Sequence, residues 1–157
     1  MTEPISPAKG YSEFTITCVF DAPRELVFRA WTDPDQFSRW WGGKGTTTPR
    51  ETMRMDVRPG GEWYADMTSD ADGSKHPFAG VYREIVENER LVLTLSEGDR
   101  PDPDREHVMT VTFADLDGKT EMVFTQAGDF SEFTAEQLEG LRGGWGSFFD
   151  SLAEEVE

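Results

Sequence analysis

The stretch Thr134–Val156, TAEQLEGLRGGWGSFFDSLAEEV, decides the fold of this chain. Most of its apolar residues recur at intervals of three or four, which places them on one stripe of an α-helix. The stripe consists of Leu138, Leu141, Trp145, Phe148, Phe149, Leu152 and Val156. Thr134 as N-cap and Gln137 three residues later predict a capping box at the start. A helix with so many large side chains on one face requires a broad apolar surface to pack against.

Four glycines lie inside this predicted helix. Each costs about 1 kcal/mol relative to alanine in a helix interior. They lack the Lys-Ser/Thr of a phosphate-binding loop. Their number suggests that another segment passes close to the helix backbone or that the helix is locally irregular, and we interpret them as packing glycines: Gly140, Gly143, Gly144 and Gly146.

The remainder of the chain is rich in strand patterns, which would supply the apolar surface. Alternating residues and the turn signals Asp72–Gly73 and Asp117–Gly118 predict antiparallel hairpins. The predicted strands cover residues 13–20, 53–57, 62–69, 78–86, 91–95, 109–113 and 122–126. In the first hairpin, parity places Trp63, Ala65 and Met67 on the same face as Phe78, Gly80 and Tyr82. In the second, it places Met109, Val111 and Phe113 on the same face as Met122, Phe124 and the polar Gln126.

Two short helices are predicted between the first two strands. Pro23 suits the first position of one helix, and Asp33 suits the N-cap of the other, which ends at Gly42–Gly43. We therefore expect an α+β fold with a curved antiparallel sheet of six to seven strands wrapped round the long C-terminal helix. Residues 1–10 read as a flexible tail, and residues 11–157 as a single domain.

Composition narrows the classes of partner. Asp and Glu number 31 against 15 Lys and Arg, so the formal charge is −16, which disfavours nucleic acid and anionic membranes. No apolar run has the length of a membrane span, and the N-terminus lacks a signal-peptide pattern. Cys18 is the single cysteine, which excludes an internal disulfide. We expect a cytoplasmic protein without membrane insertion.

Several short motifs stand in an order found in one known family: residues 14–27, Trp40–Trp41–Gly42, residues 59–63, Asp72–Gly73, residues 80–85, Leu91–Val92–Leu93 and Gly144–Trp145. Over about residues 12–156 the chain resembles the domain related to the C-terminal part of the activator of Hsp90 ATPase. This domain belongs to the START and Bet v 1-like superfamily. The resemblance implies the helix-grip fold, with a cavity between sheet and long helix that often holds a hydrophobic small molecule.

The expected cavity lining combines inward aromatic rings with one inward amide, and Trp40 and Trp41 are expected at its mouth. The alternative for each residue is ordinary core. The expected lining is Trp40, Trp41, Met55, Trp63, Ala65, Phe78, Tyr82, Val111, Phe113, Phe124, Gln126, Trp145 and Phe149.

Other reactive residue types predict little chemistry. We expect His76 and His107 to be exposed to solvent, because neither belongs to a nucleophile pattern. Cys18 is expected to be a buried, inert thiol. Glu84 is expected at the rim or in an ion pair, with a ligand anchor as the alternative. The acidic group of Asp99, Asp102, Asp104 and Glu106 is expected in a solvated loop, with weak cation binding as the alternative. We predict no catalytic residue, no metal site and no cofactor.

Three functions remain open. The first is a non-catalytic binding domain for a small hydrophobic molecule such as a lipid, an aromatic compound or a polyketide. The second is a cyclase- or aromatase-like enzyme that uses the same cavity. The third, by analogy with the family's chaperone activators, is a module that binds an Hsp90-type chaperone. A homodimer is also left open.

Overall fold

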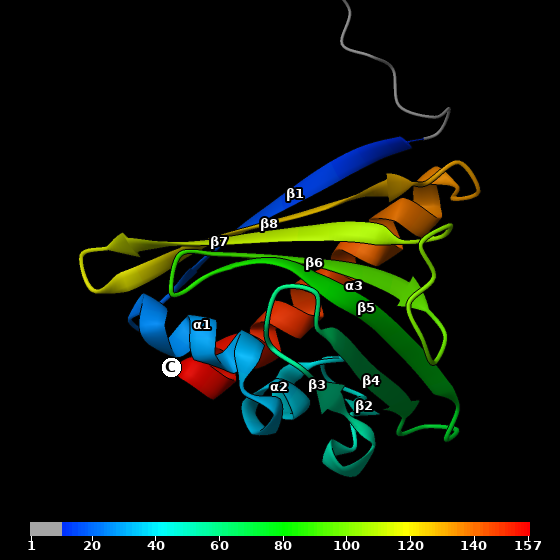
Figure 1. Cartoon of the computed structure of the whole chain (residues 1–157), viewed down its shortest axis with the longest axis horizontal. Helices are drawn as coiled ribbons and strands as arrows, with labels where there is room; N and C mark the ends of the chain where they lie inside the picture. Colours follow the sequence, from blue (N-terminus) through cyan, green and yellow to red (C-terminus); the bar gives the residue numbers. More distant parts are fainter. Residues whose placement is uncertain (1–10) are drawn as a thin grey trace, which may run out of the picture.

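The computed structural model describes residues 11–157 (Figure 1). The predicted N-terminal tail, residues 1–10, lies outside the described residues. The elements in chain order are β1 (Tyr11–Phe20), α1 (Arg24–Thr32), α2 (Pro34–Trp40), β2 (Thr46–Thr47), the 3-10 helix η1 (Arg50–Thr52), β3 (Arg54–Met55), β4 (Glu62–Ser69), β5 (Lys75–Val86), β6 (Arg90–Glu97), β7 (His107–Leu116), β8 (Lys119–Asp129) and α3 (Ala135–Val156).

One antiparallel sheet runs in the order β1-β8-β7-β6-β5-β4-β2, and β3 also pairs with β4. The hairpin registers agree with the predicted faces. Trp63 lies opposite Gly80 and Ala65 opposite Phe78, while Val111 lies opposite Phe124. Because strand side chains alternate between faces, these pairs bring the apolar residues onto one inner face.

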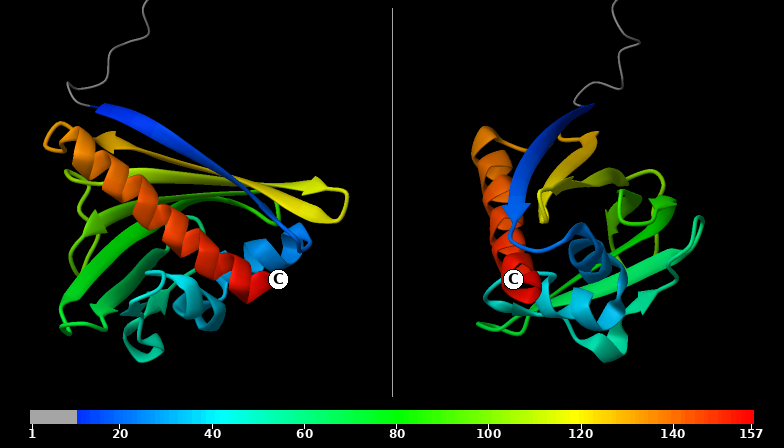
Figure 2. Two further views of the ribbon diagram at one scale, coloured as in Figure 1. Left: turned by 180° about the vertical axis from the view of Figure 1, so that it is seen from behind. Right: turned by 90° about the vertical axis from the view of Figure 1, so that its left-hand side faces the viewer.

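Helix α3 crosses this inner face diagonally, and α1 and α2 cover one end of it (Figure 2). The predicted capping box is present, with the Thr134 hydroxyl and the Gln137 side chain each accepting a backbone N–H. Trp145, Phe149 and Leu152 of the predicted stripe are buried. The curved sheet, the long helix and the two short helices together confirm the helix-grip fold.

The two short helices form as predicted and are joined closely. Asp33 caps α2 by accepting a hydrogen bond from the backbone N–H of Asp35 at 2.9 Å. Pro23 is the N-cap of α1 rather than its first helical residue. The indole N–H of Trp40 donates to the carbonyl of Ala30 at 2.8 Å, which ties α2 to α1.

The sheet differs from the prediction at its β4 edge. Residues 53–57 form only the two-residue strand β3, because Arg58 and Gly61 close a tight turn directly after it. Residues 46–47 add a short strand that the sequence did not predict. The sheet of the described residues therefore has eight strands, two of them very short.

The interpretation of the α3 glycines as packing glycines is wrong. The helix is continuous through them. A Cβ atom added at any of the four would meet no atom of another segment within 4 Å. Their backbone therefore faces open space. The closely approached glycines lie in the sheet instead, where a Cβ on Gly80 would collide with the carbonyl oxygen of Thr94.

Candidate functional site

The inner face of the sheet divides into two ends with different packing. At the end covered by α1 and α2, large aromatic rings fill the interior. Trp40, Phe124 and Phe149 are each 3% exposed or less. Their ring centroids lie close to neighbouring rings, with Phe124 at 4.5 Å from Trp145 and 5.2 Å from Phe149. We call this group the aromatic cluster: Trp31, Phe37, Trp40, Trp41, Trp63, Phe124, Trp145 and Phe149.

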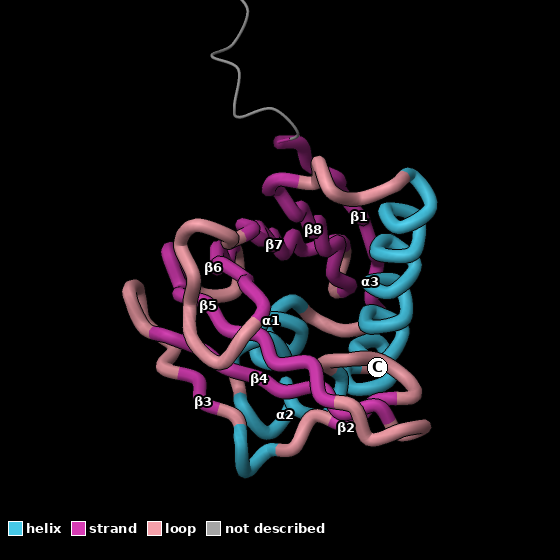
Figure 3. The backbone as a smooth tube through the Cα atoms, turned by 90° about the vertical axis from the view of Figure 1, so that its right-hand side faces the viewer, coloured by secondary structure: helices cyan, strands magenta, loops and turns pink. Residues whose placement is uncertain are grey.

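At the other end, the inner residues are apolar but only half-buried. This end carries the starts of β1, β5 and β7 and the finishes of β4, β6 and β8, and it faces the viewer in Figure 3. The first half of α3 lies beside it. We call these side chains the open-end residues: Phe14, Met67, Phe78, Leu95, Leu141 and Phe148.

Two consecutive hydrogen bonds connect the filled end and the open end of the inner face. The indole N–H of Trp145 donates to Gln126 Oε1 at 2.7 Å. The amide nitrogen of Gln126 then lies 2.7 Å from Nδ1 of His107. Because the Gln126 oxygen is taken by Trp145, its nitrogen is the donor to His107, and His107 must carry its own proton on Nε2. Trp145, Gln126 and His107 are thus neutral and bonded to one another.

The expectation that His107 is exposed to solvent is wrong. Its ring is half-buried, packs edge-on against Phe130 at 4.7 Å, and lies over Gly128, where a Cβ would overlap it. Burial lowers the pKa of His107, although the backbone and charge of Asp129 and the charge of Glu97 act in the opposite direction. His107 is therefore held neutral beside Gln126.

The other singled-out residues lie mostly as expected. His76 is exposed, and Glu84 pairs with Arg90 at 2.7 Å on the surface. Cys18 is half-buried, and burial, followed by the charge of Asp150, raises the pKa of its thiol. Burial also raises the pKa of Tyr82, so its hydroxyl stays neutral.

The predicted lining residues divide between these surroundings. Trp40, Trp41, Trp63, Phe124, Trp145 and Phe149 belong to the aromatic cluster, and Phe78 belongs to the open end. Gln126 links the two. The remaining buried members of the predicted set lie in the same core: Ala65, Tyr82, Val111 and Phe113. Met55 is half-buried against it at the β4 edge.

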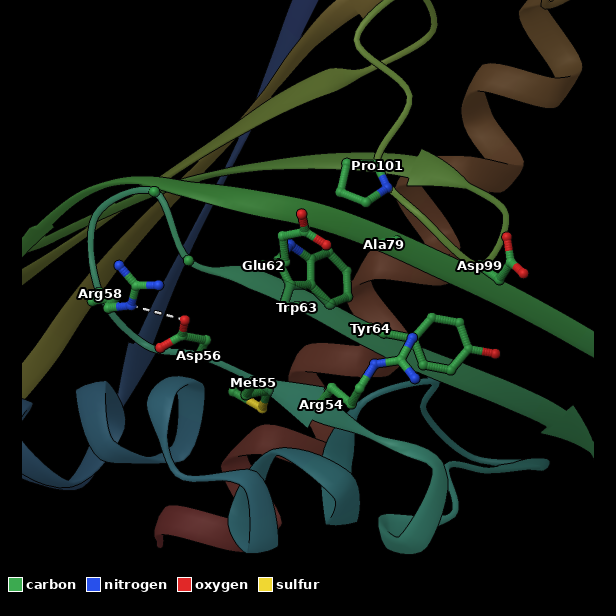
Figure 4. A pocket seen from close by; sticks show the side chains of 12 residues that line it. Arg54, Met55, Asp56, Arg58, Glu62, Trp63, Tyr64, Ala79, Asp99 and Pro101 are labelled. Carbon is green, nitrogen blue, oxygen red and sulfur yellow. Dashed lines mark hydrogen bonds and ion pairs between the residues drawn. The ribbon is translucent and has the colours of Figure 1, made fainter.

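A pocket of about 490 Å³ lies on the opposite, outer face of the sheet, between β3, β4 and the loop that carries Asp99 and Pro101 (Figure 4). Met55 and Trp63 are the predicted residues that line it. Its two arginines already have partners, since Arg58 pairs with Asp56 at 2.8 Å and Arg54 lies over the Tyr64 ring at 5.0 Å. This pocket therefore offers little unpaired positive charge to a ligand.

Among residues 11–157, no group of three His, Cys, Asp or Glu side chains is arranged to hold a metal ion. None of the helices described combines the length and the apolarity that crossing a lipid bilayer requires.

The family of the activator of Hsp90 ATPase homolog 1-like protein matches residues 21–157 of the chain. The chain belongs to this family. Its membership agrees with the helix-grip architecture and with the resemblance carried by the sequence motifs. No curated protein matches the chain.

Solved structures with the same fold cover nearly the whole chain. A protein from Chromobacterium violaceum is 27% identical, with a TM-score of 0.80 over 93% of this chain and 98% of its own. The AHSA1-like protein from Aeromonas hydrophila is 25% identical, with a TM-score of 0.73 over 92% of each chain. A protein from Nitrosomonas europaea, at 24% identity and a TM-score of 0.78 over 92% of this chain and 93% of its own, shares the fold.

Sequence reasoning did not include His107 and most of the open-end residues in the site. The alternation of Leu91, Leu93 and Leu95 and the stripe on α3 already marked several of them as apolar and inward. The missing information was the position along each strand, because parity alone does not distinguish a covered end from an uncovered one.

Proposed function

We propose that the chain binds a small, mostly apolar molecule at the open end of its inner face. The observation that carries this proposal is the group of six half-buried apolar residues at that end. The side chains of the aromatic cluster, by contrast, are all buried. Apolar surface that is left partly exposed in a concave fold gains about 25 cal/mol for each Å² that a ligand covers.

The aromatic cluster supports this site from below rather than forming it. Its rings are packed at centroid distances of 4.5–6.5 Å, so they form a rigid floor. Rigid aromatic floors favour binding, because little side-chain entropy is lost when a ligand settles on them.

Binding is favoured over catalysis by the state of the inner polar groups. Acid–base catalysis of the cyclase type uses ionisable groups that face the substrate. Here Nδ1 of His107 accepts from Gln126, and Gln126 also accepts from Trp145. Both side chains are therefore engaged in holding the interior together.

The proposal is tested with the neutral dye N-phenyl-1-naphthylamine, whose fluorescence rises in apolar surroundings. We expect saturable binding to the purified protein, with displacement by aliphatic alcohols and aromatic ketones. Leu95→Gln places an amide among the open-end residues and should weaken dye binding several-fold. Leu116→Gln, the same change at an exposed site in the β7–β8 hairpin, is the matched control and should leave binding unchanged. Equal loss in both variants, or no saturable binding at all, contradicts the proposal.

The family name suggests a second candidate, a module that binds an Hsp90-type chaperone. Its test is the ATPase rate of a purified bacterial Hsp90 with and without the chain. Stimulation that survives Leu95→Gln would assign this activity to a surface separate from the open end.

A further inference from the structure

Trp41 lies where the aromatic cluster meets the open end. Its ring is 3% exposed and lies 5.3 Å from the ring of Phe148, an open-end residue. The rings of Trp63 and Trp145 each lie 5.5 Å away. The next residue, Gly42, approaches Met67, a second open-end residue, with 3.4 Å from a built Cβ to its sulfur. Trp41 therefore belongs to the floor beneath the half-buried side chains.

The indole N–H of Trp41 is buried without a hydrogen-bond acceptor among the described residues. The same group is satisfied in Trp40 by Ala30, in Trp63 by Thr94 and in Trp145 by Gln126. A buried donor without a partner costs about 1–3 kcal/mol. Such a cost is tolerated most readily where a ligand supplies the acceptor.

Trp31 provides an internal comparison, because its indole N–H is also buried and unpartnered. The rings around Trp31 are fully enclosed: Trp40 at 4.8 Å and Phe149 at 6.3 Å are both buried. Trp41 differs in its contact with the half-buried Phe148. A ligand at the open end would therefore reach Trp41 before Trp31.

The charge of the protein restricts the acceptor. The formal charge is −16, so an anionic headgroup would be repelled on approach. The guanidinium of Arg142, near this end, lies over the Phe14 ring at 5.6 Å and donates to the Thr15 carbonyl at 3.4 Å. The inner polar groups His107 and Gln126 are neutral and already bonded. An uncharged oxygen is the acceptor that fits this site.

We propose that Trp41 Nε1 is the hydrogen-bond donor that orients the ligand, and that the ligand is an uncharged apolar molecule carrying a single acceptor oxygen, such as a ketone, ester or alcohol. This inference rests on the proposed binding function and adds the ligand class and the residue that selects it.

The test compares ligands with the same ten-carbon chain, namely 2-decanone, 1-decanol, decane and decanoate, by displacement of N-phenyl-1-naphthylamine. We expect the ketone and the alcohol to bind more tightly than decane, and decanoate to bind most weakly. Trp41→Phe keeps an aromatic ring but removes the donor. It should lower the affinity for 2-decanone by about 2- to 10-fold, the worth of one ordinary hydrogen bond, and leave the affinity for decane unchanged.

Trp31→Phe is the matched control, since it also removes an unpartnered indole N–H and should leave the ratio of ketone to decane affinity unchanged. A second measurement uses the unaltered protein. In a ¹⁵N-labelled sample, 2-decanone should move the indole N–H signal of Trp41 downfield more than decane does. If the protein binds ketone and decane equally, or if Trp41→Phe retains the preference, this inference fails while the proposed function stands. If no compound displaces the dye, both fail.

Discussion

At the scale of single residues, Gln126 holds two partners that come from different elements. Its oxygen accepts from Trp145 on α3, and its nitrogen reaches His107 on β7. Each partner is 19 positions away in the sequence. Because the Gln126 side chain is only 3% exposed, water cannot readily replace either bond.

Gln126→Leu should therefore lower the free energy of unfolding by about 1–3 kcal/mol, because it leaves the buried indole N–H of Trp145 unpaired. Thr125→Val, on the outer face of the same strand, removes only an exposed hydroxyl contact with Thr15 and should cost less. Urea unfolding of both variants measures the difference. A loss for Thr125→Val equal to that for Gln126→Leu would contradict this role.

The lowered pKa of His107 makes stability depend on pH. In the unfolded chain His107 titrates near pH 6.5, so below that pH the unfolded state takes up a proton before the folded state does. The contribution of His107 is therefore complete above about pH 6.5 and is lost as the pH falls toward its lower folded pKa. Geometry gives the same sign, since a protonated Nδ1 could no longer accept from Gln126.

His107→Gln should reduce the loss of stability between about pH 7.5 and pH 5.5, a window that spans the ordinary pKa of histidine. Other titrating groups are the same in both proteins, so the difference between their two pH profiles isolates His107. His76→Gln, at an exposed position, serves as control. Parallel profiles for the unaltered protein and His107→Gln would show that His107 is not held neutral.

At the scale of elements, α3 combines a well-formed start with a glycine-rich middle. Its capping box stabilises the first turn, and Trp145, Phe149 and Leu152 anchor its second half. Between them the glycines meet no atom of another segment within 4 Å of a built Cβ. None of the four has a positive φ. Alanine would therefore fit there without strain.

We predict that Gly143→Ala and Gly144→Ala each raise the free energy of unfolding by about 0.5–1 kcal/mol, through the lower helix propensity of glycine. Gly80→Ala is the contrasting variant and should destabilise strongly, because its Cβ would collide with the Thr94 carbonyl. Thermal unfolding followed by circular dichroism measures all three. Destabilisation by both α3 changes would revive the packing interpretation.

At the scale of the whole molecule, the charge of −16 opposes compaction. Surface ion pairs such as Arg39–Glu155 and Arg90–Glu84 offset this only slightly, since exposed pairs contribute about 0–1 kcal/mol each. The net effect of the surface charges should therefore be repulsive.

Raising sodium chloride from about 10 mM to about 150 mM shortens the Debye length from about 30 Å to about 8 Å. The repulsion is then screened, and the melting temperature should rise. Differential scanning calorimetry at several salt concentrations gives the result. A fall in melting temperature would mean that the ion pairs outweigh the repulsion.

Sequence periodicity by itself predicted a curved antiparallel sheet around a long C-terminal helix and the residues that face inward, and the resemblance to a known family added the helix-grip fold. Apolar steps of three and four specify the stripe on α3, and alternation with hairpin turns specifies which strand residues share a face. Both patterns follow from the local geometry of helices and strands, so they can be recognised in the sequence without coordinates. The strand β2 was not predicted and β3 was predicted too long, because a strand of two residues is too short to show an alternating pattern.

Only the tertiary structure decided how the inner face is filled. It brought His107, Gln126 and Trp145 into one hydrogen-bonded chain, left the α3 glycines beside open space, and separated a filled aromatic end from a half-buried apolar end. The physical reason is that periodicity specifies the direction of a side chain but not what lies opposite it. The neighbours of a side chain are set by the packing of residues that lie far apart in the chain.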